Sequence, residues 1–338
     1  MIGAGSWGTA LAIHLKKNAH EVSLFGRSKN GIEKMRNTRE VGAKLPGVKL
    51  PEEIVLTSEL KEAVSGKEML ILAVPSPAVR ETAAKLREAD PSGKGLKGRI
   101  IVNVAKGLED KTLLRLSEVM DEELPDAEIA VLSGPSHAEE VAAALPTVLV
   151  AGALRKSTAE AVQSVFMREE LRVYTSPDLI GMEMGGALKN VIALAAGMAD
   201  GLGYGDNTKA ALITRGAHEI IRLAVRMGGA AETLYGLTGI GDLIVTCESR
   251  HSRNRKAGML IGQGKTTEEA LSEVQMVVEG VNTARAAKRL AEKYEVSMPI
   301  ISAVNEVLFE GKSAADAVRE LMIRDKRVEN TRLEWKEI

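Results

Sequence analysis

Short runs of aliphatic and β-branched residues alternate with amphipathic stretches over the first half of the chain. Two of these runs, 71–74 and 100–102, are apolar at every position, which is typical of strands that a parallel sheet buries on both faces. The expected strands are 21–25, 54–56, 69–74, 100–104, 128–132, 147–150 and 171–174, with helices between them such as 9–17 and 77–86. This alternation predicts a doubly wound, Rossmann-type α/β domain with a parallel sheet.

The pattern changes near 176–178, where Ser-Pro-Asp fits a turn followed by a helix start. Beyond it, apolar positions recur with helical spacing. The expected helices are 178–199, 208–227, 280–294, 299–309 and 314–322, with a glycine-rich loop at 197–207. We therefore predict two domains, a Rossmann-type domain over residues 1–177 and an all-helical domain over residues 178–338. We expect the charged tail 324–338 to be only partly ordered.

Composition narrows the class of protein. The 338 residues carry a net charge of -1, which argues against a general binder of nucleic acids or anionic membranes. The longest uncharged apolar stretch, 190–199, is too short to cross a bilayer, and the first residues do not resemble a signal peptide. Neither Cys247, the only cysteine, nor the five histidines show metal-ligand spacing. We expect a cytoplasmic protein with no membrane span, no nucleic-acid partner and no metal.

A glycine-rich turn opens the chain. Gly3, Gly5 and Gly8 have the spacing of a dinucleotide-binding turn and lead into an apolar helical stretch. The first glycine permits the tight turn, the second lets the backbone approach a pyrophosphate, and the third lets the helix pack on its strand. The helix N-terminus then offers unpaired N–H groups to the phosphates. A glycine turn without a ligand is the alternative, and the helix and second strand that follow argue against it.

Only Met1 and Ile2 precede this turn. The central strand of such a sheet normally needs about 5–6 residues. We therefore expect that this strand is clipped, or that the chain begins later than its relatives do. If the strand is shortened in the folded protein, we expect a lower affinity for the cofactor.

Arg27 stands at the end of the second predicted strand, where an NAD-selective site usually carries Asp or Glu. A guanidinium at this place suits the 2′-phosphate of NADP(H), with Ser28 and Lys29 in support. We therefore expect NADP(H) to be preferred, while NAD(H) stays open as a cofactor. A solvated basic loop is the alternative interpretation of these residues.

Two polar segments follow predicted strands, and loops at the carboxyl ends of parallel strands line the ligand crevice. Lys106 comes after the strand 100–104, so we place it near cofactor and substrate; an ordinary surface lysine is the alternative. The segment 133–138 follows the next strand and offers two hydroxyl groups and free backbone N–H groups. These suit an anion or a nicotinamide amide, although the same residues also make an ordinary turn.

Lys189 lies in a stripe of very small residues. On a helix, Gly181, Gly185, Lys189, Ala193 and Gly197 fall on one face. The rest of the helix is nearly free of charge, which predicts that it is buried. Burial lowers the pKa of a lysine and favours proton transfer near neutral pH. A lysine that reaches solvent at a domain edge is the alternative.

Three further segments carry polar side chains that a ligand can use. Asp242 lies in the glycine-bounded turn 239–243. The segment 252–256 is a basic cluster that can bind a phosphate, but it also fits a solvated helix start. Glu279 stands just before a predicted helix, where capping is the simpler role.

Jointly, these motifs resemble the bacterial-type glycerol-3-phosphate dehydrogenases, which interconvert dihydroxyacetone phosphate and sn-glycerol 3-phosphate. The resemblance extends from Gly3 to about Leu321. The motifs that carry it, in the order and spacing of the family, are Gly-Ala-Gly-Ser-Trp-Gly-Thr-Ala (3–10), Ala-Lys-Gly-Leu (105–108), Ser-Gly-Pro-Ser (133–136), Leu-Lys-Asn-Val (188–191), Gly-Asp-Leu (241–243) and Ser-Arg-Asn (252–254). The chain departs from the family in the near absence of residues before Gly3.

The resemblance implies a role for each matched residue. Lys189 matches the catalytic lysine that donates or accepts the proton at the reacting oxygen, and Lys106 matches a lysine that contacts cofactor and substrate. The matched substrate-binding positions are Lys106, Gly134, Ser136, Lys189, Asp242, Ser252, Arg253 and Asn254. The cofactor-binding positions are Gly3, Gly5, Ser6, Trp7, Gly8, Arg27, Lys106, Ala138, Arg253, Val277 and Glu279.

The expected activity is therefore the NAD(P)-dependent reduction of dihydroxyacetone phosphate to sn-glycerol 3-phosphate for glycerophospholipid synthesis, with Lys189 as acid and base. A dehydrogenase of a carboxylated hydroxy acid stays open, because the 252–254 cluster can also hold a carboxylate. A non-catalytic NADP(H)-binding regulator is a second alternative, against which Lys106 and Lys189 argue. We expect a homodimer, whose interface the apolar helical domain can supply.

Overall fold

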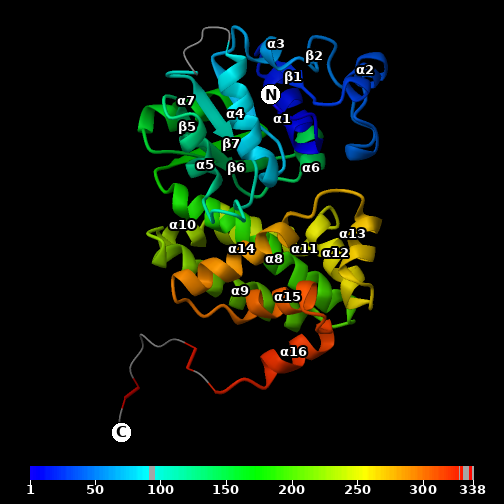
Figure 1. Ribbon diagram of the computed structural model, residues 1–338, viewed down its shortest axis with the longest axis vertical. Coiled ribbons are helices and arrows are strands. Elements are labelled where there is room, and N and C mark those ends of the chain that lie inside the picture. The colour runs from blue at the N-terminus through cyan, green and yellow to red at the C-terminus, as the bar shows by residue number, and fades with distance from the viewer. Residues whose placement is uncertain (91–95, 327, 330–334, 337–338) are drawn as a thin grey trace.

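The computed structural model describes residues 1–90, 96–326, 328–329 and 335–336. Within them an α/β domain is followed by a helical domain, which confirms the predicted fold class. Figure 1 shows the sheet with its helices, coloured blue to green, stacked on the helices of the second domain, coloured green to red. Of the tail 324–338, residues 327, 330–334 and 337–338 lie outside the described residues.

Within the described part of the chain, seven strands form the sheet, each within three residues of its predicted bounds. They are β1 (Ser23–Phe25), β2 (Val55–Thr57), β3 (Met69–Leu72), β4 (Ile100–Asn103), β5 (Glu128–Ser133), β6 (Thr147–Ala153) and β7 (Leu171–Ser176). β2 pairs with β1, and β3 to β7 follow in sequence order. The paired strands run parallel except β5 and β6. Between β5 and β6, the chain does not cross back to the end of the sheet at which β5 begins, as a parallel connection requires.

Ile2 closes the gap between β1 and β3. Its N–H donates to the carbonyl of Ile71 (2.8 Å), and the N–H of Gly3 donates to the carbonyl of Phe25 (3.0 Å). Ile2 thus forms parallel bridges to Phe25 and Leu72 where the expected first strand would stand. Gly3 begins the glycine turn where the strand order reverses, which is the point at which such sheets bind ligands.

Apolar layers cover both faces of the sheet, as the fully apolar strands predict. Ile71 packs with residues of α1 and α7 on one face, and Leu70 and Leu72 pack with residues of α4 and α5 on the other. The helices of this domain are α1 (Ser6–Lys17), α2 (Lys29–Thr38), α3 (Leu60–Val64), α4 (Val79–Ala89), α5 (Leu116–Glu123), α6 (Ala138–Ala142) and α7 (Lys156–Phe166), with 3₁₀ turns at Gly42–Lys44 and Ser76–Ala78.

The helical domain is built around α8 (Leu179–Gly201), which is buried along most of its length. Among the residues that the structure describes, α8 is the one helix long and apolar enough to cross a membrane, but 94% of its apolar window is buried inside the fold. The helices around it are α9 (Asp206–Arg226), α10 (Ala231–Tyr235), α11 (Asp242–Glu248), α12 (Arg253–Gly262), α13 (Thr267–Val274), α14 (Glu279–Lys293), α15 (Pro299–Phe309) and α16 (Ala314–Met322), with a π-helical turn at Leu237–Gly241.

The predicted glycine-rich loop at 197–207 is wrong over most of its length. α8 continues to Gly201 and α9 begins at Asp206. A Cβ on Gly197 would lie 2.0 Å from the carbonyl oxygen of Arg255, and one on Gly201 would lie 2.2 Å from that of Met259. These glycines therefore permit close packing of α8 on α12 and do not mark a loop.

Candidate active site

A cavity of about 200 Å³ opens between the carboxyl ends of the strands and the helical domain. Its walls come from α1, from the loops after β4 and β5, and from α8, α11 and α12. The predicted site residues that line it are Ser6, Trp7, Lys106, Ser136, Ala138, Lys189, Asp242, Ser252, Arg253, Asn254, Val277 and Glu279. The residues predicted for cofactor and for substrate therefore meet in one place. A larger hollow of about 510 Å³ beside α15 is lined by none of them.

Five predicted residues lie outside this wall. Gly3, Gly5 and Gly8 form the turn into α1, next to the lining residues of that helix. Gly134 lies behind Lys106, whose Nζ donates to the Gly134 carbonyl oxygen (2.8 Å). Arg27 is exposed directly after β1.

Asp242 joins the two predicted lysines. Lys189 Nζ donates to Asp242 Oδ1 and to Thr246 Oγ1, the second bond being 2.8 Å long. Lys106 Nζ donates to Asp242 Oδ2 (2.7 Å). One carboxylate, itself 1% exposed, thus holds an ammonium group from each domain.

Burial is the largest influence on the pKa of Lys189. It lowers the pKa of Lys189 to about 7, an effect that Asp242 opposes and the charge of Lys106 reinforces. Burial by itself would raise the pKa of Asp242, but the ammonium groups of Lys106 and Lys189 outweigh it and hold this pKa below its usual value. Near neutral pH the cluster therefore combines an ionised carboxylate with a lysine that can give up or take a proton.

Thr246, which lies one helical turn after Asp242 on α11, was not among the predicted site residues. Its hydroxyl accepts from Lys189 and donates to the backbone carbonyl of Asp242 (2.6 Å). The four-residue spacing from Asp242, on a helix following the glycine turn, is the signal that could have found it.

Two histidines in the cavity wall were also missed as site residues. His137 and His251 lie with ring centroids 5.9 Å apart. Burial lowers the pKa of His137, and the nearby Lys189 lowers it further. Together they add polar ring atoms to a wall that already carries three cationic side chains, those of Lys106, Lys189 and Arg253.

The basic cluster 252–256 begins α12. Ser252 caps this helix by accepting the N–H of Arg255 (3.2 Å), and Arg253 is exposed to the cavity. Asn254 is buried, donates to Asn190 Oδ1 (2.9 Å) and accepts the N–H of Gly280 (2.9 Å). Its amide therefore connects α12 to α8 and α14. The sequence did not indicate this structural role of Asn254.

Glu279 is the first residue of α14, and Val278 takes the cap position. The Glu279 carboxylate reaches the α/β domain, where it accepts the N–H (3.0 Å) and the hydroxyl group (2.5 Å) of Ser76. Capping of its own helix is therefore not its role. Its contact with Ser76 fastens the two domains beside the cavity.

The glycine turn has room for a dinucleotide. Gly3 has φ +121°, and a Cβ there would lie 2.4 Å from the Ala73 carbonyl oxygen. A Cβ on Gly8 would lie 2.0 Å from the Gly3 carbonyl oxygen, whereas one on Gly5 would meet nothing within 4 Å. Gly5 also caps α1 without a side-chain hydrogen bond. The open space at Gly5 and the N-terminus of α1 thus fit a pyrophosphate.

The two residues that follow Arg27 have partners within the fold. Ser28 caps α2 by accepting the N–H of Gly31 (3.1 Å), and Lys29 pairs with Glu59 (3.5 Å). Ser28 and Lys29 thus each have a partner within the fold, whereas Arg27 is exposed just beyond the end of β1.

Comparison with known proteins agrees with this geometry. Residues 1–159 match the N-terminal model, and residues 178–319 the C-terminal model, of NAD-dependent glycerol-3-phosphate dehydrogenase. The chain belongs to this family. It is 61% identical over 336 residues to a glycerol-3-phosphate dehydrogenase [NAD(P)+] of Agathobacter rectalis, covering 99% of this chain and 98% of that protein. The corresponding protein of Fusobacterium nucleatum is 56% identical, covering 97% of each chain.

A solved structure of a glycerol-3-phosphate dehydrogenase, from Coxiella burnetii, has a TM-score of 0.91 at 36% identity and covers 96% of this chain and 98% of its own. Membership of the glycerol-3-phosphate dehydrogenase family makes the chain an oxidoreductase that uses NAD(P). Lys106 lies in the part of the chain that matches the N-terminal model, and Lys189 and Asp242 lie in the part that matches the C-terminal model. The cluster of these three residues is therefore assembled from both parts of the enzyme.

Proposed function

We propose that this chain reduces dihydroxyacetone phosphate to sn-glycerol 3-phosphate, with Lys189 as the acid and base. The observation that carries the proposal is the cluster in which Asp242 holds Lys106 and Lys189 inside the cavity. A buried lysine with a pKa of about 7 can act in either direction of a carbonyl–alcohol interconversion near neutral pH.

The α/β domain, for which we propose the bounds 1–177, binds the dinucleotide at Gly3, Gly5 and Gly8. Ser6, Trp7 and Ala138 lie along the cavity from this turn, and Val277 and Glu279 contribute from the helical domain. When bound, the nicotinamide supplies the hydride that reaches C2 of the substrate. Arg27 favours NADP(H) over NAD(H), because its guanidinium can bind a 2′-phosphate.

Lys189 acts on the oxygen of the reacting carbonyl. Two of the three N–H donors of its ammonium group are bound by Asp242 and Thr246, which leaves one for the substrate. As negative charge develops on the carbonyl oxygen, this donor stabilises the charge and transfers its proton. In the reverse direction, the neutral amine of Lys189 takes the proton from the alcohol.

Lys106 and Asp242 keep Lys189 in place and set its charge. Asp242 holds the amine in a fixed direction, and Lys106 adds positive charge beside the reacting oxygen. Lys106 is bound a second time by the carbonyl group of Gly134, so it is held as rigidly as its partner.

The phosphate group of the substrate binds at the start of α12. Arg253 supplies a guanidinium that faces the cavity, and Ser252 and Asn254 flank it. Ser136 lines the cavity from the α/β domain, and its hydroxyl group donates to the Gly134 carbonyl oxygen (2.9 Å). Holding the phosphate at a distance from Lys189 fixes the carbon that reacts.

Three further properties follow from this activity as proposals. The product enters glycerophospholipid synthesis, the enzyme works in the cytoplasm, and it forms a homodimer through its helical domain, for which we propose the bounds 178–338. Each can be tested apart from the chemistry, by lipid labelling, by fractionation and by sedimentation.

The deciding experiment follows NADPH oxidation with and without dihydroxyacetone phosphate. Oxidation that depends on this substrate supports the proposal, and a parallel assay with a 2-keto acid tests the hydroxy-acid alternative. The Lys189→Met variant should lose at least ~10²-fold in kcat and still bind NADPH. Near-normal turnover in Lys189→Met, or activity with the keto acid alone, would show the proposal to be wrong.

A further inference from the structure

Glu183 makes a buried contact between the two domains that lies outside the cavity wall. It stands on α8, and its side chain is 4% exposed. Oε1 accepts the N–H of Ser117 (2.8 Å), and Oε2 accepts the Ser117 hydroxyl group (2.5 Å) and the Arg115 guanidinium (2.7 Å). All three donors belong to the start of α5 in the α/β domain, so Glu183 fastens that helix to α8.

The loop that ends at Arg115 is the loop that carries Lys106. Leu108 and Arg115 form an antiparallel bridge, which places the two arms of this loop side by side. Leu108 is 3% exposed and packs in the apolar core of the helical domain. The loop is therefore seated on the helical domain at four places: Lys106 on Asp242, Leu108 in the core, Asp110 against Arg289 of α14, and Arg115 on Glu183.

Gly186 shows that Lys106 lies on the same face of α8 as Glu183. A Cβ on Gly186 would lie 3.6 Å from Cγ and 3.8 Å from Cδ of Lys106. Residues three apart on a helix point to the same side. The aliphatic stem of Lys106 thus rests on α8 one turn beyond the carboxylate that holds the other end of its loop.

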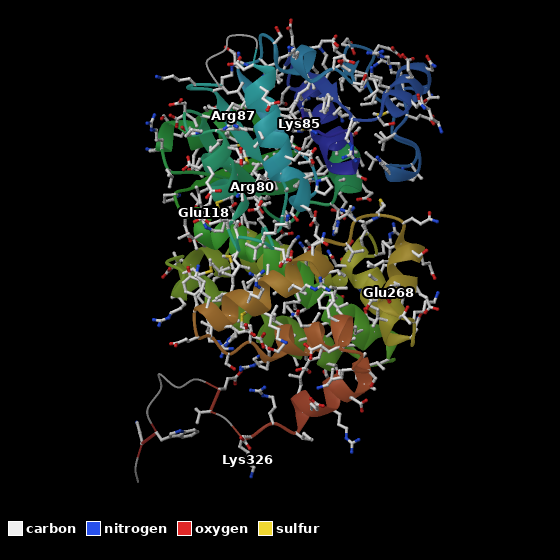
Figure 2. All side chains as sticks on the ribbon, in the orientation of Figure 1. Arg80, Lys85, Arg87, Glu118, Glu268 and Lys326 are labelled. Atoms are coloured by element: carbon white, nitrogen blue, oxygen red, sulfur yellow. The ribbon has the colours of Figure 1, made fainter. Side chains whose placement is uncertain are left out.

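The outer side of the loop is held differently. Arg80 on α4 binds both carboxylate oxygens of Glu109, at 2.8 Å each. Figure 2 places Arg80 and Glu118 near the boundary of the two domains. The Arg80 contact stays within the α/β domain, so it stiffens the loop without setting its position on α8. Of the charged contacts between the loop and the helical domain, the ion pair of Asp110 with Arg289 is half-exposed. Glu183 supplies the buried one at the α5 end of the loop, opposite the end that carries Lys106.

We propose that Glu183 is a positioning residue for the reaction: by binding Arg115 and Ser117 it fixes the loop that presents Lys106 to Asp242. The proposal rests on the function proposed above, because the place of Lys106 matters only if Lys189 and Asp242 carry out the chemistry. Without the carboxylate, the start of α5 is free to shift on α8, and Lys106 moves away from Asp242.

Such a shift has an electrostatic signature at Lys189. The titratable groups around Lys189 are Asp242 and Cys247 on α11, Lys106 on the loop, and His137 before α6. The charge of Lys106 lowers the pKa of Lys189. When Lys106 withdraws, the pKa of Lys189 rises, and the activity in the direction of reduction persists to higher pH. A loss of stability alone does not move this pH dependence.

The test uses Glu183→Gln, which keeps the shape of the side chain, and Ser117→Ala, which removes one of the three bonds. Glu219→Gln is the matched control. Glu219 is also buried, and it accepts the N–H groups of Ile300 (2.8 Å) and Ile301 (3.2 Å) at the start of α15, inside the helical domain. All variants are compared in thermal unfolding, in KM for NADPH, and in kcat/KM for dihydroxyacetone phosphate across pH.

Glu183→Gln should lower kcat/KM by about tenfold or more and shift its falling limb to higher pH, with KM for NADPH little changed. Ser117→Ala should show a smaller change in the same direction. Glu219→Gln should be less stable than the wild type, but its kcat/KM should fall at the same pH as that of the wild type. In a Lys106→Met background, Glu183→Gln should have little further effect on kcat/KM, because both act through one side chain.

Two outcomes overturn the proposal. In the first, both Glu183→Gln and Ser117→Ala keep the wild-type kcat/KM and its wild-type dependence on pH. In the second, the effects of Glu183→Gln and Lys106→Met on kcat/KM are fully additive. If Glu183→Gln does not fold, Ser117→Ala alone decides. Failure of the proposed function is distinguishable, because wild-type protein would then show no oxidation of NADPH that depends on dihydroxyacetone phosphate.

Discussion

Lys106 and Lys189 come from different domains and bind opposite oxygens of the same carboxylate, that of Asp242. The two ammonium groups repel one another, and Asp242 is the charge that makes their approach possible. Burial and Lys106 together bring the pKa of Lys189 to about 7. The arrangement thus depends on the contact between the domains and sets the charge of the proposed acid.

Removing the charge of Asp242 should affect both stability and pH dependence. Asp242→Asn leaves two buried or half-buried ammonium groups without their counter-charge, which should cost about 3–5 kcal/mol of unfolding free energy. Asp242 raises the pKa of Lys189, so its loss lowers that pKa further below about 7. Reduction should then fall off at lower pH than in the wild type. Denaturant unfolding and kcat/KM against pH check the two parts, and an unmoved pH limb would contradict the second.

Substitutions of two glycines in the first turn should have different effects, one on stability and the other on cofactor binding. A Cβ on Gly8 collides with backbone, so Gly8→Ala should lower the free energy of unfolding by about 1–3 kcal/mol or more. A Cβ on Gly5 meets nothing within 4 Å, so Gly5→Val should fold normally and raise KM for NADPH by about tenfold or more. Thermal unfolding and nucleotide kinetics distinguish them. An unchanged KM for NADPH in Gly5→Val would show that the pyrophosphate does not bind at this turn.

Arg27 should decide between the two nucleotides. Loss of one charge-assisted contact to the 2′-phosphate predicts that Arg27→Ala lowers kcat/KM for NADPH by about tenfold or more and leaves the value for NADH nearly unchanged. Arg172→Ala is the control, because Arg172 is an exposed arginine of β7 at the other end of the sheet. If the wild type uses NADH far better than NADPH, the interpretation of Arg27 fails.

Two neighbours on α12 should behave differently when substituted. Arg253 is exposed, so Arg253→Ala should raise KM for dihydroxyacetone phosphate by about tenfold or more and leave the unfolding temperature unchanged. The amide of Asn254 binds Asn190 and Gly280, so Asn254→Leu should also lower stability, by about 1–3 kcal/mol per lost buried partner. Equal stability of both variants would show that the amide contacts contribute little.

Much of the fold followed from local patterns. The apolar runs of β3 and β4 predicted a sheet covered on both faces, and the small-residue stripe predicted the burial of Lys189, which is 5% exposed. The glycines at 197 and 201 misled the prediction, because a glycine that permits two helices to touch resembles a loop glycine in one sequence. Only the partner helix distinguishes the two cases.

The contacts between the domains could not be predicted from the sequence. Nothing near Glu183 or Ser117 indicates that they bond, since the partners belong to separate local patterns. The same holds for Glu279, whose position suggested a helix cap and whose carboxylate instead holds Ser76. Motif spacing identified the individual residues of the cluster, and the tertiary fold decided which of them share a carboxylate.

The most direct test of the account is the pH dependence of kcat/KM for dihydroxyacetone phosphate in the wild type and in Lys189→Met, since kcat/KM reports the groups of the free enzyme. We expect the wild-type value to fall above about pH 7, and Lys189→Met to be slow and to show no such fall. Ionisation of the substrate phosphate is common to both enzymes and cancels in the comparison. The same limb in both enzymes would contradict the assignment of the proton to Lys189.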